Sequence, residues 1–201
     1  ATLRGTARWD LAALDAAMQY PQALGIFNCA LGFEVSMDKT PHLAKLMRTS
    51  GGDAARSTGA AKNLYMRTRP YAQHGETTCY PEHEQVLRTN GSYPSGHTAS
   101  GWATALVLTE LVPDRANELL ARGRAFGESR MICNYHWQSD VAQARDIASA
   151  TVARLHAVPE FQQDLETARK EVASARERNA GPGRDCEAEA RALAQVIPAA
   201  Q

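Results

Sequence analysis

The chain has 201 residues, of which 44% are hydrophobic and 22% are charged, a composition typical of a soluble globular domain and unlike that of a disordered chain. Lys and Arg together number 22, as do Asp and Glu, so the formal net charge is zero and the chain lacks the positive field with which nucleic-acid-binding proteins attract phosphate backbones. No segment has the roughly 20 consecutive apolar residues of a membrane span. We therefore expect no nucleic-acid partner and no transmembrane helix.

The first half of the chain shows helical periodicity and almost no strand signal. Apolar residues at helical spacing predict helices at about 12–18, at 43–47 after a Thr-Pro start, and at about 52–67. Pro70 ends the third of these, because proline disfavours helix at the residue before it. The segment 71–93 contains Pro81, Asn90 and Gly91, and it is predicted to be a long loop.

The second half of the chain is predicted to be almost entirely helical. Residues 98–111 are rich in Ala and Leu and apolar on several faces, as expected of a central buried helix. Further helices are predicted at 114–135, 140–156, 159–179 and 186–196. We therefore predict an all-α, single-domain helical bundle over residues 1–201, with a helical tail from about residue 160.

Two cations precede the predicted loop. Lys62 and Arg69-Pro70 are seven residues apart, which is two helical turns, so both charges would project from one face if the helix continued that far. A solvated basic face is the alternative, since charged helix faces are common.

A second polar segment, 91–98, has the sequence Gly-Ser-Tyr-Pro-Ser-Gly-His-Thr and lies just before the Ala-rich helix. A helix N-terminus offers free N–H groups and the positive end of the dipole, which together favour an anion. Ser95 adds a hydroxyl, Gly96 permits close backbone approach, and His97 carries a titratable proton. The alternative is an ordinary helix N-cap.

The third segment contains Arg130, His136 and Asp140. The histidine and the aspartate are four residues apart, so the carboxylate can hold one imidazole nitrogen and leave the other free as a nucleophile. Taken alone, such a pair is more often a surface contact.

The three segments in this order, K-x6-R-P, P-S-G-H and S-R-x5-H-x3-D, resemble the signature of the type 2 phosphatidic acid phosphatase (PAP2) superfamily, which includes vanadium haloperoxidases. Within it, the runs at 91–98 and 133–140 are similar to those of the bacterial class A non-specific acid phosphatases. The resemblance covers about 50–161. Asn134 departs from it, since glycine is expected there, and it could crowd the backbone before His136.

This resemblance implies a metal-independent acid phosphatase that acts on phosphate monoesters through a phosphohistidine and can also transfer the phosphoryl group to alcohols. It implies that His136 is the nucleophile, His97 the general acid and Asp140 the partner that orients His136. The phosphate ligands that it implies are Lys62, Arg69, Ser95, Gly96 and Arg130. The expected partners are small phosphomonoesters and inorganic phosphate. No metal or other cofactor is expected, and vanadate is expected to inhibit as a transition-state mimic.

Two other functions stay open from the sequence. Because orthovanadate resembles the phosphorane in shape and charge, the same ligand set could hold it as a prosthetic group, with His136 as axial ligand, in a haloperoxidase. A helical module that binds phosphate without turnover is the second. Hydrolysis of p-nitrophenyl phosphate separates a phosphatase from such a module.

The four cysteines, Cys29, Cys79, Cys133 and Cys186, contain no C-x-x-C pair, and on count alone two disulfides and four thiols are equally open. Cys79 lies in the loop and Cys133 just before His136, so we expect these two to pair near the active site and the other two to tie the N-terminal region to the tail. A periplasmic or secreted location after removal of a signal peptide is expected, as is a homo-oligomer.

Overall fold

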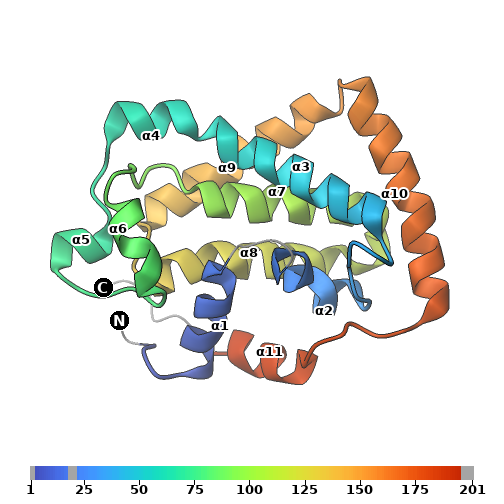
Figure 1. Ribbon diagram of the computed structural model, residues 1–201, viewed down its shortest axis with the longest axis horizontal. Coiled ribbons are helices and arrows are strands. Elements are labelled where there is room, and N and C mark those ends of the chain that lie inside the picture. Colours follow the sequence, from blue (N-terminus) through green and yellow to red (C-terminus); the bar gives the residue numbers. More distant parts are fainter. Residues whose placement is uncertain (1–2, 18–21, 196–201) are drawn as a thin grey trace.

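Helix α7 (Gly96–Leu111) runs through the middle of the computed structural model, and other helices surround it (Figure 1). The structure describes residues 3–17 and 22–195. Among these residues there is no strand, and no helix is long and apolar enough to cross a membrane. The predicted all-α fold with a central buried helix is therefore confirmed.

The long helices that pack on α7 are α3, α8, α9 and α10. Their bounds are Pro41–Ser57 (α3), Ala116–Ile132 (α8), Gln138–Leu155 (α9) and Pro159–Arg178 (α10). On α7, Ala99, Ala103, Ala105, Val107 and Leu108 have no exposed surface, because this helix meets neighbours on several sides. Small residues let these neighbours approach: a Cβ built on Gly101 would lie 2.2 Å from Cδ1 of Phe126 on α8.

Shorter elements lie at one end of this bundle, as α4, α5 and α6 do, or along its side beside α8, as α1, α2 and α11 do (Figure 1). Their bounds are Ala7–Ala16 (α1), Gln22–Phe27 (η1), Asn28–Leu31 (α2), Gly59–Tyr65 (α4), Pro70–His74 (α5), Pro81–His83 (η2), Glu84–Leu87 (α6), Pro113–Arg115 (η3) and Cys186–Leu193 (α11). Helix α1 packs on α8 and on α11, so the N-terminal region and the tail meet beside the bundle.

Several predicted boundaries were wrong. The segments 43–47 and 52–67 do not form two helices divided near Gly51-Gly52, because α3 continues through both glycines to Ser57. The segment 71–93 is not one loop, since it contains most of α5, as well as η2 and α6. Pro70 does not end the preceding helix, which ends at Tyr65. Pro70 and Pro81 instead start α5 and η2 at a helix N-terminal position, where the missing N–H of proline has no cost. Met18 and Val196, expected in the first and last helices, lie outside the described residues.

Candidate active site

The phosphate-binding candidates come together at the N-terminus of α7, but not in the way that the sequence predicts. Helix α4 ends at Tyr65, and Met66 adopts a left-handed conformation (φ 40°), so Lys62 and Arg69 do not share a helix face. The reversal at Met66 brings Arg69 back to the N-cap of α5. Lys62 and Arg69 nevertheless converge, because both donate to the carbonyl oxygen of Gly91, at 2.8 and 3.4 Å.

Arg69 is fixed by carbonyl groups from two directions. Its Nε donates to the oxygen of Leu87 at 3.0 Å, and its Nη1 donates to the oxygen of Tyr135 at 3.1 Å. The same Nη1 lies 3.1 Å from Nε2 of His136. Because a guanidinium can only donate, this contact requires Nε2 of His136 to be the unprotonated nitrogen.

His136 and Asp140 meet at the start of α9. Nδ1 of His136 lies 3.4 Å from Oδ2 of Asp140, and both side chains are buried. Asp140 also accepts the backbone N–H of Trp137 at 2.9 Å, which is a capping interaction at the first turn of α9. The proton on Nδ1 therefore faces the carboxylate, and the lone pair of Nε2 faces the cations.

Two residues that the sequence analysis missed complete the surroundings of Asp140. Ser92 Oγ donates a short hydrogen bond to Oδ2 of Asp140 and lies 3.4 Å from Nδ1 of His136. Arg67 Nη1 donates to Oδ1 of Asp140 at 2.7 Å. Ser92 lies inside the polar run at 91–98, which was a signal for it, whereas nothing in the sequence distinguishes Arg67 from other charged residues.

The N-terminus of α7 has the N-cap that the sequence analysis gave as the alternative. Ser95 is the N-cap, and its Oγ accepts the N–H of Thr98 at 3.2 Å and the hydroxyl of Thr98 at 2.9 Å. Because Oγ accepts both bonds, its own proton is left to donate. Gly96 borders Lys62, since a Cβ built on Gly96 would lie 3.8 Å from Cε of that lysine. His97, one residue further, is partly exposed.

Arg130 supplies the third positive charge, from the last turn of α8. Its Nη2 donates to the carbonyl oxygen of Ala12 at 3.1 Å, while Nε and Nη1 are buried without a hydrogen-bond partner among the described residues. The side chain has no exposed surface. It therefore offers two unused donors, but direct contact with an anion requires the guanidinium to shift out of the wall of the site.

Burial and positive charge keep both histidines neutral. Burial lowers the pKa of His136 to about 3, with Arg69 and Lys62 adding to the effect and Asp140 opposing it. His97 is only partly exposed, and the burial of the rest of its surface, followed by the charge of Arg130, lowers its pKa well below the usual value. Lys62 is affected in the same way, because burial and then Arg69 lower its pKa to about 8. The site thus combines neutral imidazoles with cations that favour an anion.

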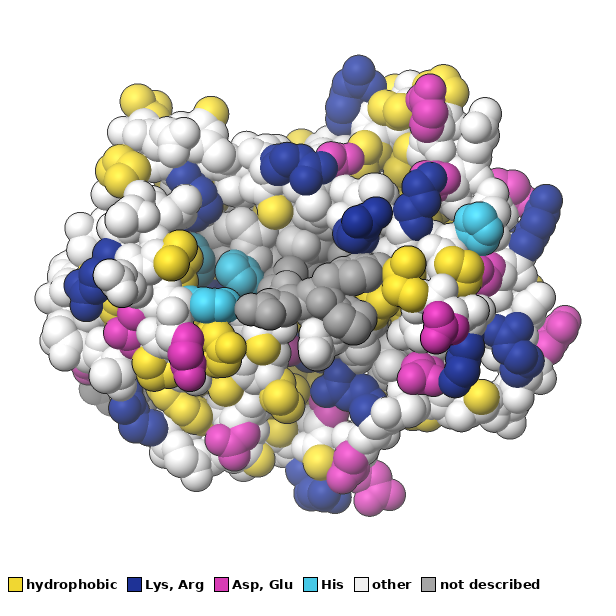
Figure 2. All heavy atoms as spheres, viewed as in Figure 1, with side chains coloured by type: hydrophobic (Ala, Val, Ile, Leu, Met, Phe, Trp, Pro, Cys, Tyr) yellow, Lys and Arg dark blue, Asp and Glu magenta, His cyan; other side chains and the backbone are white. Residues whose placement is uncertain are grey.

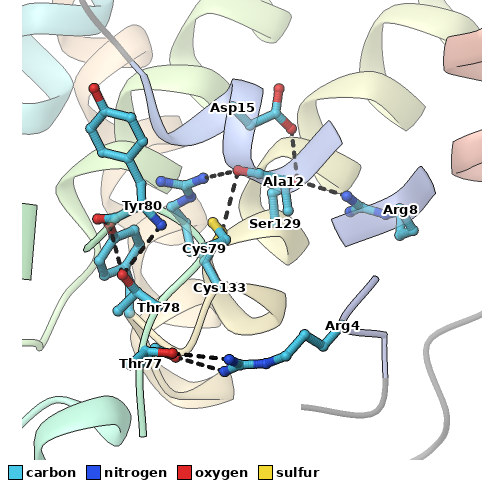
Figure 3. The surroundings of a disulfide bond; sticks show 12 residues. Arg4, Arg8, Ala12, Asp15, Thr77, Thr78, Cys79, Tyr80, Ser129 and Cys133 are labelled. Atoms are coloured by element: carbon cyan, nitrogen blue, oxygen red, sulfur yellow. Dashed lines mark hydrogen bonds between the residues drawn. A yellow bond between two sulfur atoms is a disulfide. The ribbon is translucent and has the colours of Figure 1, made fainter. Parts of the chain in front are cut away.

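The predicted disulfides are confirmed. Cys79 is bonded to Cys133 and Cys29 to Cys186, and Figure 3 shows the first of these bridges beside Ala12 of α1. Cys133 is the C-cap of α8, three residues before His136, so this bridge ties the segment that carries His136 to the loop that carries Cys79.

Asn134 does not crowd the backbone before His136. It adopts a left-handed conformation (φ 60°), which asparagine tolerates better than most residues. Its Nδ2 donates to Oε2 of Glu76 at 2.7 Å, so the side chain is directed toward the segment that follows α5.

Figure 2 shows histidine side chains gathered at a hollow on the face viewed in Figure 1, with acidic and basic groups scattered over the rest of that face. Although the formal net charge is zero, the site itself is cationic, because Lys62, Arg69 and Arg67 lie around a single carboxylate, Asp140. Among the described residues, no group of three or more His, Cys, Asp or Glu side chains is placed to hold a metal ion. The arrangement of Lys62, Arg69 and the two histidines suits a small anion with several oxygen atoms.

The chain is similar to one protein superfamily and to several bacterial acid phosphatases. Residues 49–164 match the family model described as the PAP2 superfamily. The chain is 46% identical over 172 residues to a non-specific acid phosphatase of Providencia stuartii, and this match covers 85% of the chain and 69% of the relative. A non-specific acid phosphatase of Salmonella typhimurium is 45% identical over 173 residues (85% and 68%), and an acid phosphatase of Zymomonas mobilis is 41% identical over 174 (87% and 66%).

Proposed function

The chain belongs to the PAP2 superfamily, and we propose that it is a metal-independent acid phosphatase that hydrolyses small phosphate monoesters through a phosphohistidine on His136. The observation that carries this proposal is the orientation of His136. Its Nε2 accepts from Arg69, while its Nδ1 faces Asp140. A neutral imidazole held in this tautomer beside buried cations is suited to attack phosphorus.

In the first step, the Arg69 N–H that Nε2 of His136 accepts turns to a phosphate oxygen, and Nε2 forms a bond to phosphorus as the bond from phosphorus to the alcohol oxygen breaks. His97 gives its proton to the departing alcohol. The proton on Nδ1 of His136 stays there, and Asp140 stabilises the positive charge that develops on the phosphorylated ring. Lys62, Arg69 and Arg130, together with the Ser95 hydroxyl and the Gly96 N–H, bind the phosphate oxygens in this proposal, with Arg130 moving toward the anion.

In the second step, water attacks phosphorus and His97 takes a proton from it, while the bond to Nε2 breaks and inorganic phosphate leaves. An alcohol in place of water gives a new monoester, which is the proposed phosphotransferase activity. His97 must be protonated for the first step although its pKa is lowered in the unliganded site. The negative charge of the bound phosphate raises that pKa, and acidic medium favours the same form.

The charges in the site support the proposed metal independence. Positive side chains already stand where a divalent cation would have to neutralise the phosphoryl group. Asp140, the carboxylate of the site, already accepts hydrogen bonds from Ser92, Arg67 and the Trp137 N–H. Because Asp140 already accepts these hydrogen bonds and positive side chains lie nearby, the site disfavours binding of a metal cation.

The test is hydrolysis of p-nitrophenyl phosphate by the purified chain in the presence of EDTA. We expect unchanged activity and strong inhibition by vanadate, which mimics the five-coordinate transition state. A chain that releases no p-nitrophenolate is a binding module. Activity that disappears on chelation and returns with Mg²⁺ or Zn²⁺ contradicts the assignment of the site.

We also propose an extracytoplasmic location, supported by the two disulfides, which persist in oxidising compartments. The expected homo-oligomer stays a prediction, which light scattering on the purified protein measures.

A further inference from the structure

An apolar crevice lies between α3, α7, α8 and η1, with a volume of about 550 Å³, which is in the range of small-molecule sites. Its floor consists of buried side chains from all four elements: Leu24, Ile26, Phe27, Met47, Thr104 and Phe126. Its rim is more exposed and includes Ala55 of α3 and Ser100 of α7. The lining also contains Arg48, His97, Ser100 and Thr104, but most of its exposed surface is apolar, so a ligand here would be held mainly by apolar contact.

The apolar crevice adjoins the proposed phosphate site through the N-terminus of α7. Gly96 and His97 line both of them, whereas Arg69, His136 and Asp140 do not line the crevice. The crevice therefore meets the site on the side of His97. An in-line displacement places the nucleophile and the leaving oxygen on opposite sides of phosphorus, so the group attached to the leaving oxygen extends past His97.

We propose that the apolar crevice binds the leaving group of the phosphomonoester and that the enzyme prefers monoesters of apolar alcohols. This inference rests on the proposed function, in which His97 protonates the leaving oxygen. The commonest polar leaving groups, such as sugars, would lose hydrogen bonds to water on entering the crevice. Alkyl chains lose none, and each methylene that leaves water strengthens binding up to about fourfold.

A series of n-alkyl phosphates, from methyl to hexyl, tests the proposal. The alcohols in this series have nearly equal acidity, so a longer chain changes the buried apolar surface and not the chemistry of departure. We expect kcat/KM to rise by about two- to fourfold per methylene until the crevice is filled.

The variant Ala55→Leu places a larger side chain at the rim of the crevice and keeps a good helix former in α3. We expect it to hydrolyse methyl phosphate at the wild-type rate and to lose most of the rise toward hexyl phosphate. The matched control is Ala153→Leu, the same change at an exposed position of α9 away from the crevice, which we expect to reproduce the wild-type series.

If the wild-type protein hydrolyses methyl phosphate but its kcat/KM does not rise with chain length, the crevice proposal is wrong and the proposed function stands. A rise that Ala55→Leu does not change also overturns the crevice proposal, because the chains would then bind elsewhere. If the wild-type protein hydrolyses no monoester at all, the proposed function fails, and the crevice proposal fails with it.

Discussion

At Asp140, one buried carboxylate receives donors from three parts of the chain. Burial alone would raise its pKa, but hydrogen bonds from His136 and Ser92 and from the Trp137 N–H outweigh burial and lower it. Asp140 therefore stays charged in acidic medium, where the proposed enzyme works. A charged partner that cannot rotate holds the imidazole of His136 in one tautomer.

We predict that Asp140→Asn reduces kcat on p-nitrophenyl phosphate by roughly two to four orders of magnitude, because it removes both the charge and the orientation of His136. Ser92→Ala should cost less, on the order of tenfold, since it removes one hydrogen bond to a carboxylate that keeps its other donors. Steady-state kinetics measures both. An Asp140→Asn protein within tenfold of the wild-type rate would show that His136 needs no such partner.

The charge of Lys62 sets a limit on the alkaline side. Because burial and Arg69 lower its pKa to about 8, Lys62 is charged below that pH and loses its charge above it. On p-nitrophenyl phosphate, whose leaving group needs no proton from His97, we predict that kcat/KM falls as pH rises through about 8. In Lys62→Arg the cation persists to higher pH, so the alkaline limb should move upward. If the alkaline limb lies at the same pH in the wild-type protein and in Lys62→Arg, a group other than Lys62 is responsible for it.

The residues of the site could be predicted from the sequence only in part. Lys62, Arg69, His97, Arg130 and His136 lie in three short motifs whose order resembles that of a known superfamily, so their grouping could be predicted. The contacts of Ser92 and Arg67 with Asp140 join positions 48 and 73 residues apart. No local pattern encodes such contacts, because they arise only when α4, α7 and α9 come together.

At the level of elements, the connection from α4 to α5 shows what helical periodicity misses. The helix predicted at 52–67 includes Met66, yet Met66 turns the chain in a left-handed conformation. Such a turn costs energy for a residue with a side chain, and tertiary contacts compensate for it: Ser92 N–H donates to the carbonyl oxygen of Arg67 at 2.8 Å, and Lys62 binds Gly91. Helix ends that depend on such contacts cannot be predicted from spacing.

Gly91 allows the loop before α7 to lie directly on α4. A Cβ at this position would be 2.5 Å from the carbonyl oxygen of Lys62 and 3.1 Å from Cα of Met66. We predict that Gly91→Ala separates the loop from α4, lowers the free energy of unfolding by about 1–3 kcal/mol and raises KM, since Lys62 and Arg69 both donate to the oxygen of Gly91.

Chemical denaturation and steady-state kinetics measure these two effects of Gly91→Ala. Gly59→Ala is the matched control, because a Cβ there meets nothing within 4 Å. Equal stability and equal KM in the two variants would show that the close approach of Gly91 to α4 is unimportant.

For the whole molecule, the all-α fold could be predicted because its long segments are apolar at helical spacing or, at 98–111, apolar on several faces, and some begin at a recognisable start signal. Helix α10 illustrates this, since Pro159 opens it and Asn179, in a left-handed conformation, ends it. Elements η1 and α2 were not predicted. They are six and four residues long, too short for a period to be visible, and neighbouring helices rather than propensity hold them.

The two disulfides should differ in what they affect. Cys29–Cys186 closes 157 residues, so replacing both cysteines by serine should destabilise the fold by about 5 kcal/mol from chain entropy with little effect on kcat of the folded protein. Replacing Cys79 and Cys133 should lower kcat as well, because that bridge holds the segment before His136. Thermal unfolding and kinetics on the two double variants check this. Equal kcat in the two double variants would show that the Cys79–Cys133 bridge does not affect catalysis.

The most direct test of the central claim is to trap the phosphoryl group on the protein. A phosphomonoester is mixed with the enzyme, the reaction is stopped in alkali, where phosphohistidine survives, and peptides are sequenced by mass spectrometry. We predict one phosphoryl group on His136 in the wild-type protein, and neither this adduct nor turnover in His136→Ala, since binding alone cannot replace a nucleophile. A phosphoryl group on another residue, or a His136→Ala enzyme that keeps more than about a hundredth of the wild-type rate, would contradict the mechanism.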